Sequence, residues 1–127
     1  IEHTINAAKA GWKNRIISIF EPHLYSRTKE FFKEFSEALS LSDITIITDI
    51  YGAREQEIQG ISSRLIKDEL DKKNYKNAYY IEDKNHIPNE IINLINPNDF
   101  IICMGAGKIN SINNKLINLI KDKYDDI

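Results

Sequence analysis

Short apolar runs alternate with amphipathic segments along this chain. Four of the runs are rich in Ile, Phe or Tyr and are bounded by polar residues: 15–21, 44–49, 78–82 and 99–104. Runs of this length and composition are typical of buried β-strands. The pattern therefore predicts four strands.

The segments between and after these runs repeat apolar residues at helical spacing. They cover residues 27–40, 62–72, 88–95 and 109–121, with Pro88 at a first-turn position and Pro97 beyond the end of the third. The apolar faces consist of Phe31, Phe32, Phe35, Ala38 and Leu39 in the first, Leu65, Ile66 and Leu70 in the second, and Ile109, Ile112, Leu116, Leu119 and Ile120 in the last. We predict a helix over each segment.

The first residues also have helical periodicity, since Ile1, Ile5, Ala8 and Trp12 fall on one face. No initiating Met and no N-cap residue precede them. We therefore expect this chain to be a domain taken from a longer protein.

Alternating apolar strands and helices predict one α/β domain over residues 1–127, three-layered and Rossmann-like, with a mostly parallel sheet and helices on both faces. Ligands of such sheets bind outside the carboxyl ends of the strands. Three loops leave these ends: "EPHLYSRT", "DIYGAREQEIQGISS" and "MGAGKINS". The unusual polar residues of the chain lie in these loops, so we expect the site there.

Composition narrows the classes of function. The formal net charge is −2, with both signs interspersed, so we expect no nucleic-acid partner. No apolar run approaches the roughly 18 residues of a membrane span, and residues 1–12 lack a signal-peptide pattern. The single cysteine, Cys103, excludes an internal disulfide and is expected to be a small buried apolar residue. We expect a soluble, cytoplasmic protein without membrane contact.

Three polar side chains are candidates for binding. Arg27 stands near a helix start, where the dipole disfavours a cation; it suits a carboxylate or phosphate, although pairing with Glu30 or Glu34 is the structural alternative. His23 could donate to an anion or bond a loop carbonyl. Asp49 could bind a metal or an amine, or anchor its loop.

The "GAGK" sequence at 105–108 is not a Walker A loop, because Lys108 has the wrong spacing and is followed by Ile109. A G-x-G turn between a strand and a helix still allows backbone to approach an anion closely, and a simple tight turn explains it equally well.

Three stretches, "FEPHLYSRTKEFFKEF", "ITDIYGAREQEIQGISS" and "DFIICMGAGKI", together resemble the C-terminal domain of the UDP-N-acetylmuramate–L-alanine ligases of the Mur ligase family. The opening "IEHTINAAKAGW" also resembles the segment that enters this domain, so the resemblance covers essentially the whole chain. Its most specific part is P-H-x-Y-[ST]-R-T. A related ligase that recycles murein peptides typically has F-E-P-R, and His23 favours the alanine-adding branch.

The resemblance implies an ATP-dependent ligase of peptidoglycan synthesis. In that family the N-terminal domain holds the UDP-sugar, the central domain holds ATP and Mg²⁺, and the C-terminal domain binds the amino acid and closes over the nucleotide. UDP-N-acetylmuramate is phosphorylated to an acyl phosphate, which the alanine amine attacks. The partners implied are L-alanine, UDP-N-acetylmuramate, ATP and the two other domains. By itself this chain is expected to bind no metal or cofactor and to be inactive.

Carried over by position, the resemblance assigns the alanine carboxylate to Arg27 and places His23 beside the acyl group. Tyr25 is a supporting residue, and the backbone of Gly105, Ala106 and Gly107 would face substrate oxygens. Asp49 and Tyr51 are further supporting candidates. Two residues depart from the family: Leu24 stands where many members have a second arginine, and Lys108 where a small polar or acidic residue is common.

Two alternatives remain open at this point: the murein-peptide recycling ligase, and a non-enzymatic receiver-like α/β signalling module. A receiver needs paired acidic residues after its first strand and an acceptor Asp on a central strand. Here the first strand ends in Glu21-Pro22, and only Asp49 resembles an acceptor.

Overall fold

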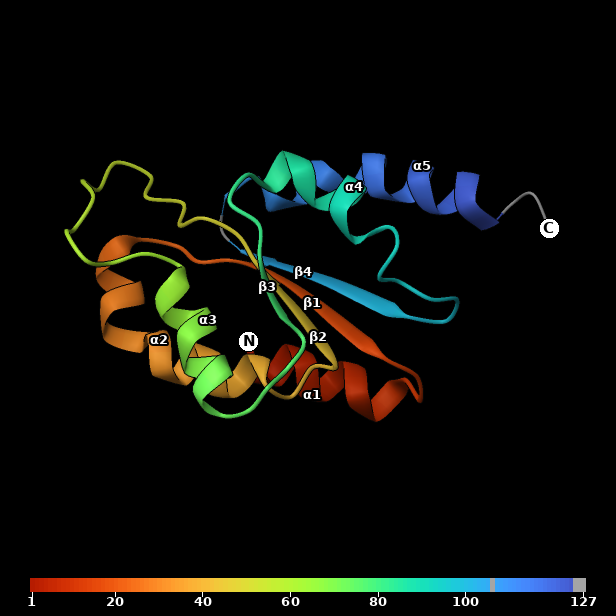
Figure 1. The fold of residues 1–127 in the computed structure, drawn as a ribbon, viewed down its shortest axis with the longest axis horizontal. Helices are drawn as coiled ribbons and strands as arrows, with labels where there is room; N and C mark the ends of the chain where they lie inside the picture. Colours follow the sequence, from red (N-terminus) through yellow and green to blue (C-terminus); the bar gives the residue numbers. More distant parts are fainter. Residues whose placement is uncertain (106, 125–127) are drawn as a thin grey trace.

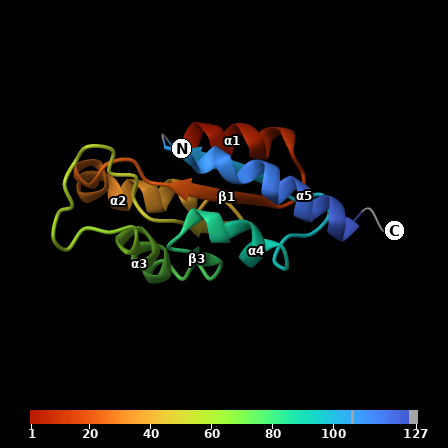
Figure 2. The ribbon, with the colours of Figure 1, turned by 90° about the horizontal axis from the view of Figure 1, so that it is seen from above.

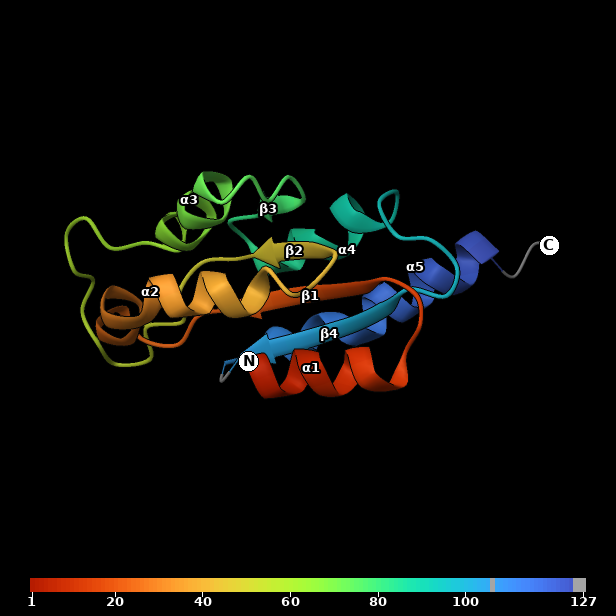
Figure 3. The same cartoon turned by 90° about the horizontal axis from the view of Figure 1, so that it is seen from below.

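The four predicted strands form one parallel sheet in the computed structural model, which describes residues 1–105 and 107–124. They are β1 (Ile16–Glu21), β2 (Ile44–Ile47), β3 (Ala78–Tyr80) and β4 (Phe100–Gly105), in the spatial order β3-β2-β1-β4 (Figure 3). All three strand pairs are parallel. The predicted mostly parallel sheet is confirmed.

Helices cover both faces of this sheet (Figure 1). One face carries α1 (Glu2–Gly11), α2 (Tyr25–Leu39) and α3 (Arg64–Lys72), and the other carries α4 (Ile87–Ile91) and α5 (Asn113–Tyr124). Short 3₁₀ turns, η1 (Lys84–His86) and η2 (Ile109–Ile112), lead into α4 and α5. The three-layer α/β fold is therefore also confirmed.

Strands β1 and β2 are buried on both faces and contribute to two cores, of which the one under α4 and α5 consists mostly of isoleucines. Under α4 and α5, Ile17, Ile19, Ile46, Ile87 and Leu116 belong to one buried cluster. Under α1, α2 and α3, Phe20, Ile47, Ile66 and Leu70 belong to the other, with Ile5 from α1. Successive residues of β1 thus alternate between the two layers, as the geometry of a strand requires.

Several predicted boundaries were wrong by two to four residues. The helix predicted over 88–95 ends at Ile91 and gives way to turns, and 109–112 is a 3₁₀ turn before α5 rather than part of it. The helix α2 begins at Tyr25, two residues before the predicted start, since Leu24 has φ +71° and cannot extend the helix backward. β2 and β3 each stop two residues before the predicted end.

The long connection between β2 and α3, residues 48–63, projects beyond the carboxyl ends of the strands (Figure 2). The turns after β1 and β4 end at the same edge of the sheet, which places the three loops singled out above together. That edge is the carboxyl edge of the sheet.

Candidate functional site

A hollow of about 560 Å³ lies at the carboxyl edge, where β1, β2 and β3 end. Glu21 is the last residue of β1, while the other residues follow β2 and β3. Its lining consists of Glu21, Thr48, Asp49, Ile50, Tyr51, Glu82, Asp83, Lys84 and His86. We call this the acidic hollow, after its four carboxylates.

His23 and Tyr51 are brought together by a parallel backbone bridge beyond the ends of β1 and β2. The Tyr51 amide donates to the Pro22 carbonyl at 2.8 Å, and the Leu24 amide donates to the Tyr51 carbonyl at 2.9 Å. The two rings stack with their centroids 5.9 Å apart and their planes 17° apart. The bridge explains the positive φ of Leu24, because the chain must turn sharply from the bridge into α2.

The glycine segment after β4 lies against the same residues. A Cβ atom on Gly107 would stand 2.5 Å from Glu21 Oε1 and 2.8 Å from Tyr51 Cγ, and a Cβ on Gly105 would stand 2.9 Å from the Glu21 carbonyl. Such distances exclude a side chain without rearrangement. The close backbone approach expected of this segment is therefore present, and what it approaches is Glu21 and Tyr51. Ala106 lies outside the described residues.

Glu21 forms an ion pair that sequence reasoning missed. Its Oε2 accepts from Lys84 Nζ at 2.9 Å, and the side chain of Glu21 is only 3% exposed. Within the described part of the chain, Glu21 Oε1 has no hydrogen-bond partner. The only sequence signal was an acidic residue ending an otherwise apolar run, and the partner lies 63 positions away.

Asp49 is held by the tyrosine that ends β3. The Tyr80 hydroxyl donates to Asp49 Oδ1, and the Arg64 guanidinium lies 4.3 Å from the centroid of the Tyr80 ring. Burial, and then the hydrogen bond to Asp49, raise the pKa of Tyr80 far above its usual value, so its hydroxyl stays a donor. This arrangement fits the reading of Asp49 as a loop anchor, although Asp49 also lines the acidic hollow.

Tyr25 supports the loop after β2 from the start of α2. A Cβ on Gly52 would stand 2.6 Å from Tyr25 Cε2, so the ring packs directly on that glycine. Burial, and then the nearby Glu57 carboxylate, raise the pKa of Tyr25. Tyr25 lines a smaller hollow of about 240 Å³ together with Asp49.

Glu55 caps α2 from across that loop. Its Oε1 accepts from the Ser26 amide at 2.8 Å and its Oε2 from the Ser26 hydroxyl. These hydrogen bonds lower the pKa of Glu55, and a carboxylate at a helix N-terminus is favoured by the dipole. This contact was not predicted, because the cap comes from 29 positions away.

Arg27 lies apart from the acidic hollow. Its guanidinium carbon is 5.7 Å from the centroid of the Phe31 ring, and the residue is exposed in the first turn of α2. It lines a separate hollow of about 240 Å³ beside Ile1 and Glu2 of the α1 region. In the described residues it has no ion pair with Glu30 or Glu34. The structure thus brings together His23, Tyr51 and Gly107, and leaves Arg27 outside their cluster.

Cys103 is half-buried on β4, where its thiol donates to Asn113 Oδ1 at 3.4 Å. Burial raises the pKa of this thiol, which disfavours the reactive thiolate. Cys103 was expected to be buried and is only half-buried, while its raised pKa fits a residue without a reactive thiolate.

Over residues 1–105 and 107–124, no group of three or more His, Cys, Asp or Glu side chains is placed to hold a metal ion. No helix in this part of the chain is long and apolar enough to cross a membrane.

Comparison with known proteins places this architecture in a family. Residues 1–107 match the family described as "Mur ligase, glutamate ligase domain". The UDP-N-acetylmuramate–L-alanine ligase of Geotalea uraniireducens is 39% identical over 95% of this chain, which covers 26% of that protein. The corresponding ligase of Syntrophus aciditrophicus is 35% identical over 98% of the chain, again 26% of the relative.

Solved structures agree on the fold. The UDP-N-acetylmuramate–alanine ligase of Thermotoga maritima matches with a TM-score of 0.70 and 23% identity, over 96% of this chain and 24% of that one. A murein peptide ligase from Psychrobacter arcticus matches with a TM-score of 0.72 and 17% identity, over 94% and 24%. The chain thus spans about a quarter of the length of the relatives it matches. By sequence and by fold, it belongs to the Mur ligase family, whose glutamate ligase domain it matches.

Proposed function

We propose that this chain is the C-terminal, amino-acid-binding domain of an ATP-dependent ligase that joins L-alanine to UDP-N-acetylmuramate in cytoplasmic peptidoglycan synthesis. The observation that carries the proposal is the 39% identity, along 95% of the chain, to a protein of that name. The cluster of His23, Tyr51 and Gly107 at the carboxyl edge supports it, because this is the edge where α/β sheets bind ligands.

In the proposed reaction the muramate carboxylate is activated as an acyl phosphate and the alanine amine attacks it. The task of this domain is to hold the amine in position and to keep water from the acyl phosphate. His23 and Tyr51 suit this task, since the bridge between their backbones fixes both rings. The glycine segment of 105–107 would bring backbone amides to the same place.

ATP and Mg²⁺ are proposed to bind to the central domain of the full-length enzyme. The described residues hold no cluster of three metal-ligating side chains, and Lys108 is not part of a Walker A loop. ATP would supply the phosphoryl group that activates the carboxylate. We propose that neither group binds to this domain alone, and the chain alone is expected to be inactive.

Arg27 is proposed to take the alanine carboxylate. Its guanidinium is exposed and rests only on the Phe31 ring, a cation–π contact worth about 0.5–1 kcal/mol at an exposed site. A charge-assisted bond to a carboxylate is stronger than this contact. The assignment therefore requires the side chain to leave Phe31 and turn toward His23.

The test is an assay of the full-length protein with UDP-N-acetylmuramate, ATP and Mg²⁺. We expect ADP release that depends on L-alanine and a product that is heavier by one alanine residue. The tripeptide L-alanyl-γ-D-glutamyl-diaminopimelate, the substrate group of the recycling alternative, should not replace alanine. ADP release with the tripeptide and not with alanine would overturn the proposal in favour of that alternative.

A further inference from the structure

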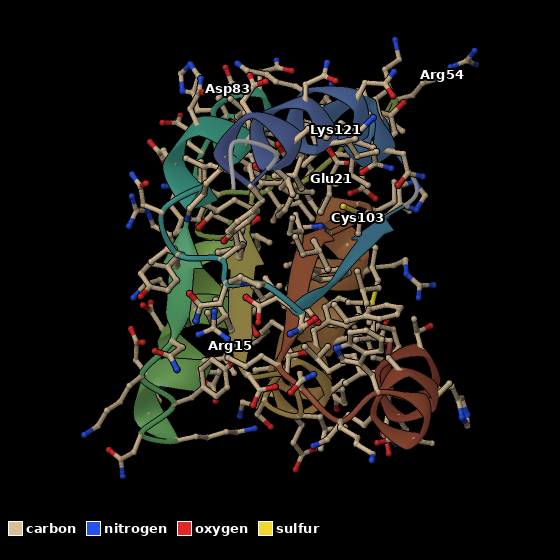
Figure 4. The ribbon with its side chains drawn as sticks, turned by 90° about the vertical axis from the view of Figure 1, so that its right-hand side faces the viewer. Arg15, Glu21, Arg54, Asp83, Cys103 and Lys121 are labelled. Atoms are coloured by element: carbon tan, nitrogen blue, oxygen red, sulfur yellow. The ribbon has the colours of Figure 1, made fainter. Side chains whose placement is uncertain are left out.

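The loop between β2 and α3 is hydrogen-bonded to α2 through one carboxylate. In Figure 4 the labelled Arg54 of this loop points away from the sheet. Among residues 1–105 and 107–124, the only hydrogen bonds that join residues 52–60 to a helix or strand run from Ser26 of α2 to Glu55. The Ser26 amide donates to Glu55 Oε1 at 2.8 Å, and its hydroxyl donates to Oε2. Removal of this carboxylate would therefore detach the loop from the start of α2.

The residue before α2 has a strained backbone. Leu24 has φ +71° and ψ +138°, and a leucine rarely adopts a positive φ, because its Cβ then crowds the backbone. On one side, the Leu24 amide donates to the Tyr51 carbonyl at 2.9 Å. On the other side, the Leu24 carbonyl accepts from the Thr28 amide at 3.1 Å and from the Thr28 hydroxyl at 2.9 Å. Ser26, with Glu55, lies in the turn between these contacts, so the conformation of Leu24 depends on its neighbours on both sides.

Leu24 also separates the two side chains that the proposed function assigns to alanine. His23 precedes it and is fixed by the bridge to Tyr51, whereas Arg27 follows it in the first turn of α2. If Leu24 relaxed to a negative φ, the first turn of α2 would rotate relative to the bridge and displace Arg27 from His23. A displacement of about 1 Å in a substrate site can lower a rate by about 100-fold. The backbone of Leu24 therefore decides whether one alanine can reach both side chains.

An ionised carboxylate suits the position of Glu55. It lies at the N-terminus of a 15-residue helix, where the dipole favours a negative charge, and residues 25–28 of that helix include no acidic residue. The bonds from Ser26, and after them the Tyr25 backbone and His23, lower the pKa of Glu55. Glu55 is therefore charged at neutral pH and stabilises the first turn of α2 both by hydrogen bonds and by its charge.

We propose that Glu55 is a positioning residue of the amino-acid site, whose hydrogen bonds to Ser26 keep the first turn of α2 in the conformation in which Arg27 and His23 reach one alanine. The inference rests on the proposed function, which assigns alanine to these two side chains. In this role Glu55 acts through Ser26 and not on the substrate itself. Because alanine binds only the fixed turn, its apparent affinity falls with the fraction of enzyme in which the turn has relaxed, whereas saturating alanine restores the turn.

The experiment measures the KM for L-alanine, the KM for UDP-N-acetylmuramate and the turnover of the full-length enzyme. Glu55→Ala removes both hydrogen bonds, and Ser26→Ala removes only the bond to Glu55 Oε2. The matched control is Glu57→Ala, which removes the same charge from an exposed position of the same loop. Leu24→Gly serves as a second background for Glu55→Ala, because glycine adopts a positive φ without steric cost.

We expect Glu55→Ala to raise the KM for alanine about 3- to 20-fold, the factor by which the loss of a helix cap shifts an equilibrium. Turnover at saturating alanine and the KM for UDP-N-acetylmuramate should stay as in the Glu57→Ala control. Ser26→Ala should raise the KM for alanine by a smaller factor, and should add nothing to Glu55→Ala, because the two residues act through one contact. In the Leu24→Gly background, Glu55→Ala should raise the KM for alanine by about twofold or less, because the turn has no strain to release.

Three results would each overturn the positioning role: an unchanged KM for alanine in a folded Glu55→Ala enzyme, an equal rise of that KM in Glu57→Ala, and an equal rise in the Leu24→Gly background. The first is the result expected of a purely structural cap, which would only lower the melting temperature. If Glu55→Ala does not fold, as judged by circular dichroism, Ser26→Ala decides by the same comparison of the two KM values. If the wild-type enzyme makes no product from alanine, the proposed function fails and the positioning role with it. A normal wild type with an insensitive Glu55 variant overturns the positioning role alone.

Discussion

An ion pair lies at each end of β1, and the two pairs differ in how many hydrogen bonds complete them. Figure 4 labels Arg15 and Glu21, which belong to the two pairs. At the amino edge of the sheet, Arg15 bonds both oxygens of Asp99, at 3.0 and 2.7 Å, and also the Leu94 carbonyl at 2.9 Å. The Asn96 amide donates to Asp99 as well. At the carboxyl edge, Glu21 Oε2 is paired with Lys84, and among residues 1–105 and 107–124 Glu21 Oε1 has no hydrogen-bond partner. The Arg15–Asp99 pair is hydrogen-bonded to backbone groups as well, whereas the Lys84–Glu21 pair leaves Glu21 Oε1 without a partner among the described residues.

This difference concerns what each pair contributes to the fold. The Arg15–Asp99 pair closes the turn before β4, and its hydrogen bonds raise the pKa of Arg15. Burial alone would raise the pKa of Asp99, but the bonds from Arg15 and Asn96 hold it below its usual value. Every oxygen of Asp99 is used for the fold. Glu21 is buried as deeply, but among the described residues one of its oxygens has no hydrogen-bond partner. An unpaired buried oxygen does not stabilise the fold.

The largest effect is expected at the carboxyl edge, on activity. Arg27→Ala in the full-length enzyme should raise the KM for alanine by about 10- to 100-fold, because it removes a charge-assisted bond to the carboxylate. Arg27→Lys should recover only part, since it loses the two-pronged geometry. Thermal stability should hardly change, because Arg27 is exposed and its cation–π contact with Phe31 contributes about 0.5–1 kcal/mol. If a folded Arg27→Ala enzyme kept its KM for alanine and its turnover, Arg27 would be a surface arginine without a role in binding alanine.

The next effect is expected at the amino edge, on stability. Arg15→Met/Asp99→Leu should destabilise the chain by about 3 kcal/mol, because the Leu94 carbonyl and the Asn96 amide lose their partners as well. Glu21→Leu/Lys84→Met should cost less than about 1 kcal/mol, because no backbone group depends on that pair. Urea unfolding of the 127-residue chain measures both. Equal losses of unfolding free energy in the two double variants would show that the two ion pairs contribute equally to stability.

The sequence predicted the fold better than it predicted these pairs. The apolar runs located all four strands within two residues. For β1 and β2 the signal is strongest, since burial on both faces leaves an uninterrupted Ile-rich run. The 3₁₀ turn η2 was predicted as part of the last helix, because Ile109 and Ile112 have an apolar spacing that a helix shares. The turn η1 and the early end of α4 were also missed.

The residues of the site could be singled out from the sequence, but their contacts with residues far away in the chain could not be predicted. His23, Tyr51 and Gly107 were singled out from their loops, and they do meet. Glu21 with Lys84 is a contact across 63 positions that only the folded sheet creates. The family resemblance grouped Arg27 with His23. In the structure Arg27 lines a separate hollow beside Ile1 and Glu2, so a shared site for the two side chains stays a prediction.

A smaller effect is expected from acid. Because the pKa of Asp99 is lowered in the folded state, its contribution to stability is present above its unfolded pKa of about 4 and is lost as the pH falls through its folded pKa. Asp99→Asn should therefore flatten the decline of the unfolding free energy as the pH falls below about 4. Chemical denaturation at several pH values measures this decline. A variant as acid-sensitive as the parent would assign that decline to other carboxylates.

The smallest effect on stability is expected from replacing His23, and the same change tests whether His23 takes part in acyl transfer. Its ring stacks on Tyr51, a contact worth about 0.5–1.5 kcal/mol, while the bridge between the two residues is made by backbone and survives any side-chain change. His23→Ala should therefore lower stability by no more than about 1.5 kcal/mol. If the imidazole lines the acyl-transfer site, turnover at saturating alanine should also fall. The matched variant is His23→Phe, which keeps an aromatic ring for stacking and loses the ring nitrogens. We expect it to restore the stability of the chain and not the turnover of the full-length enzyme. Recovery of turnover by His23→Phe would instead show that His23 acts only as a packing surface for Tyr51, and the carboxyl edge would then owe its chemistry to other groups.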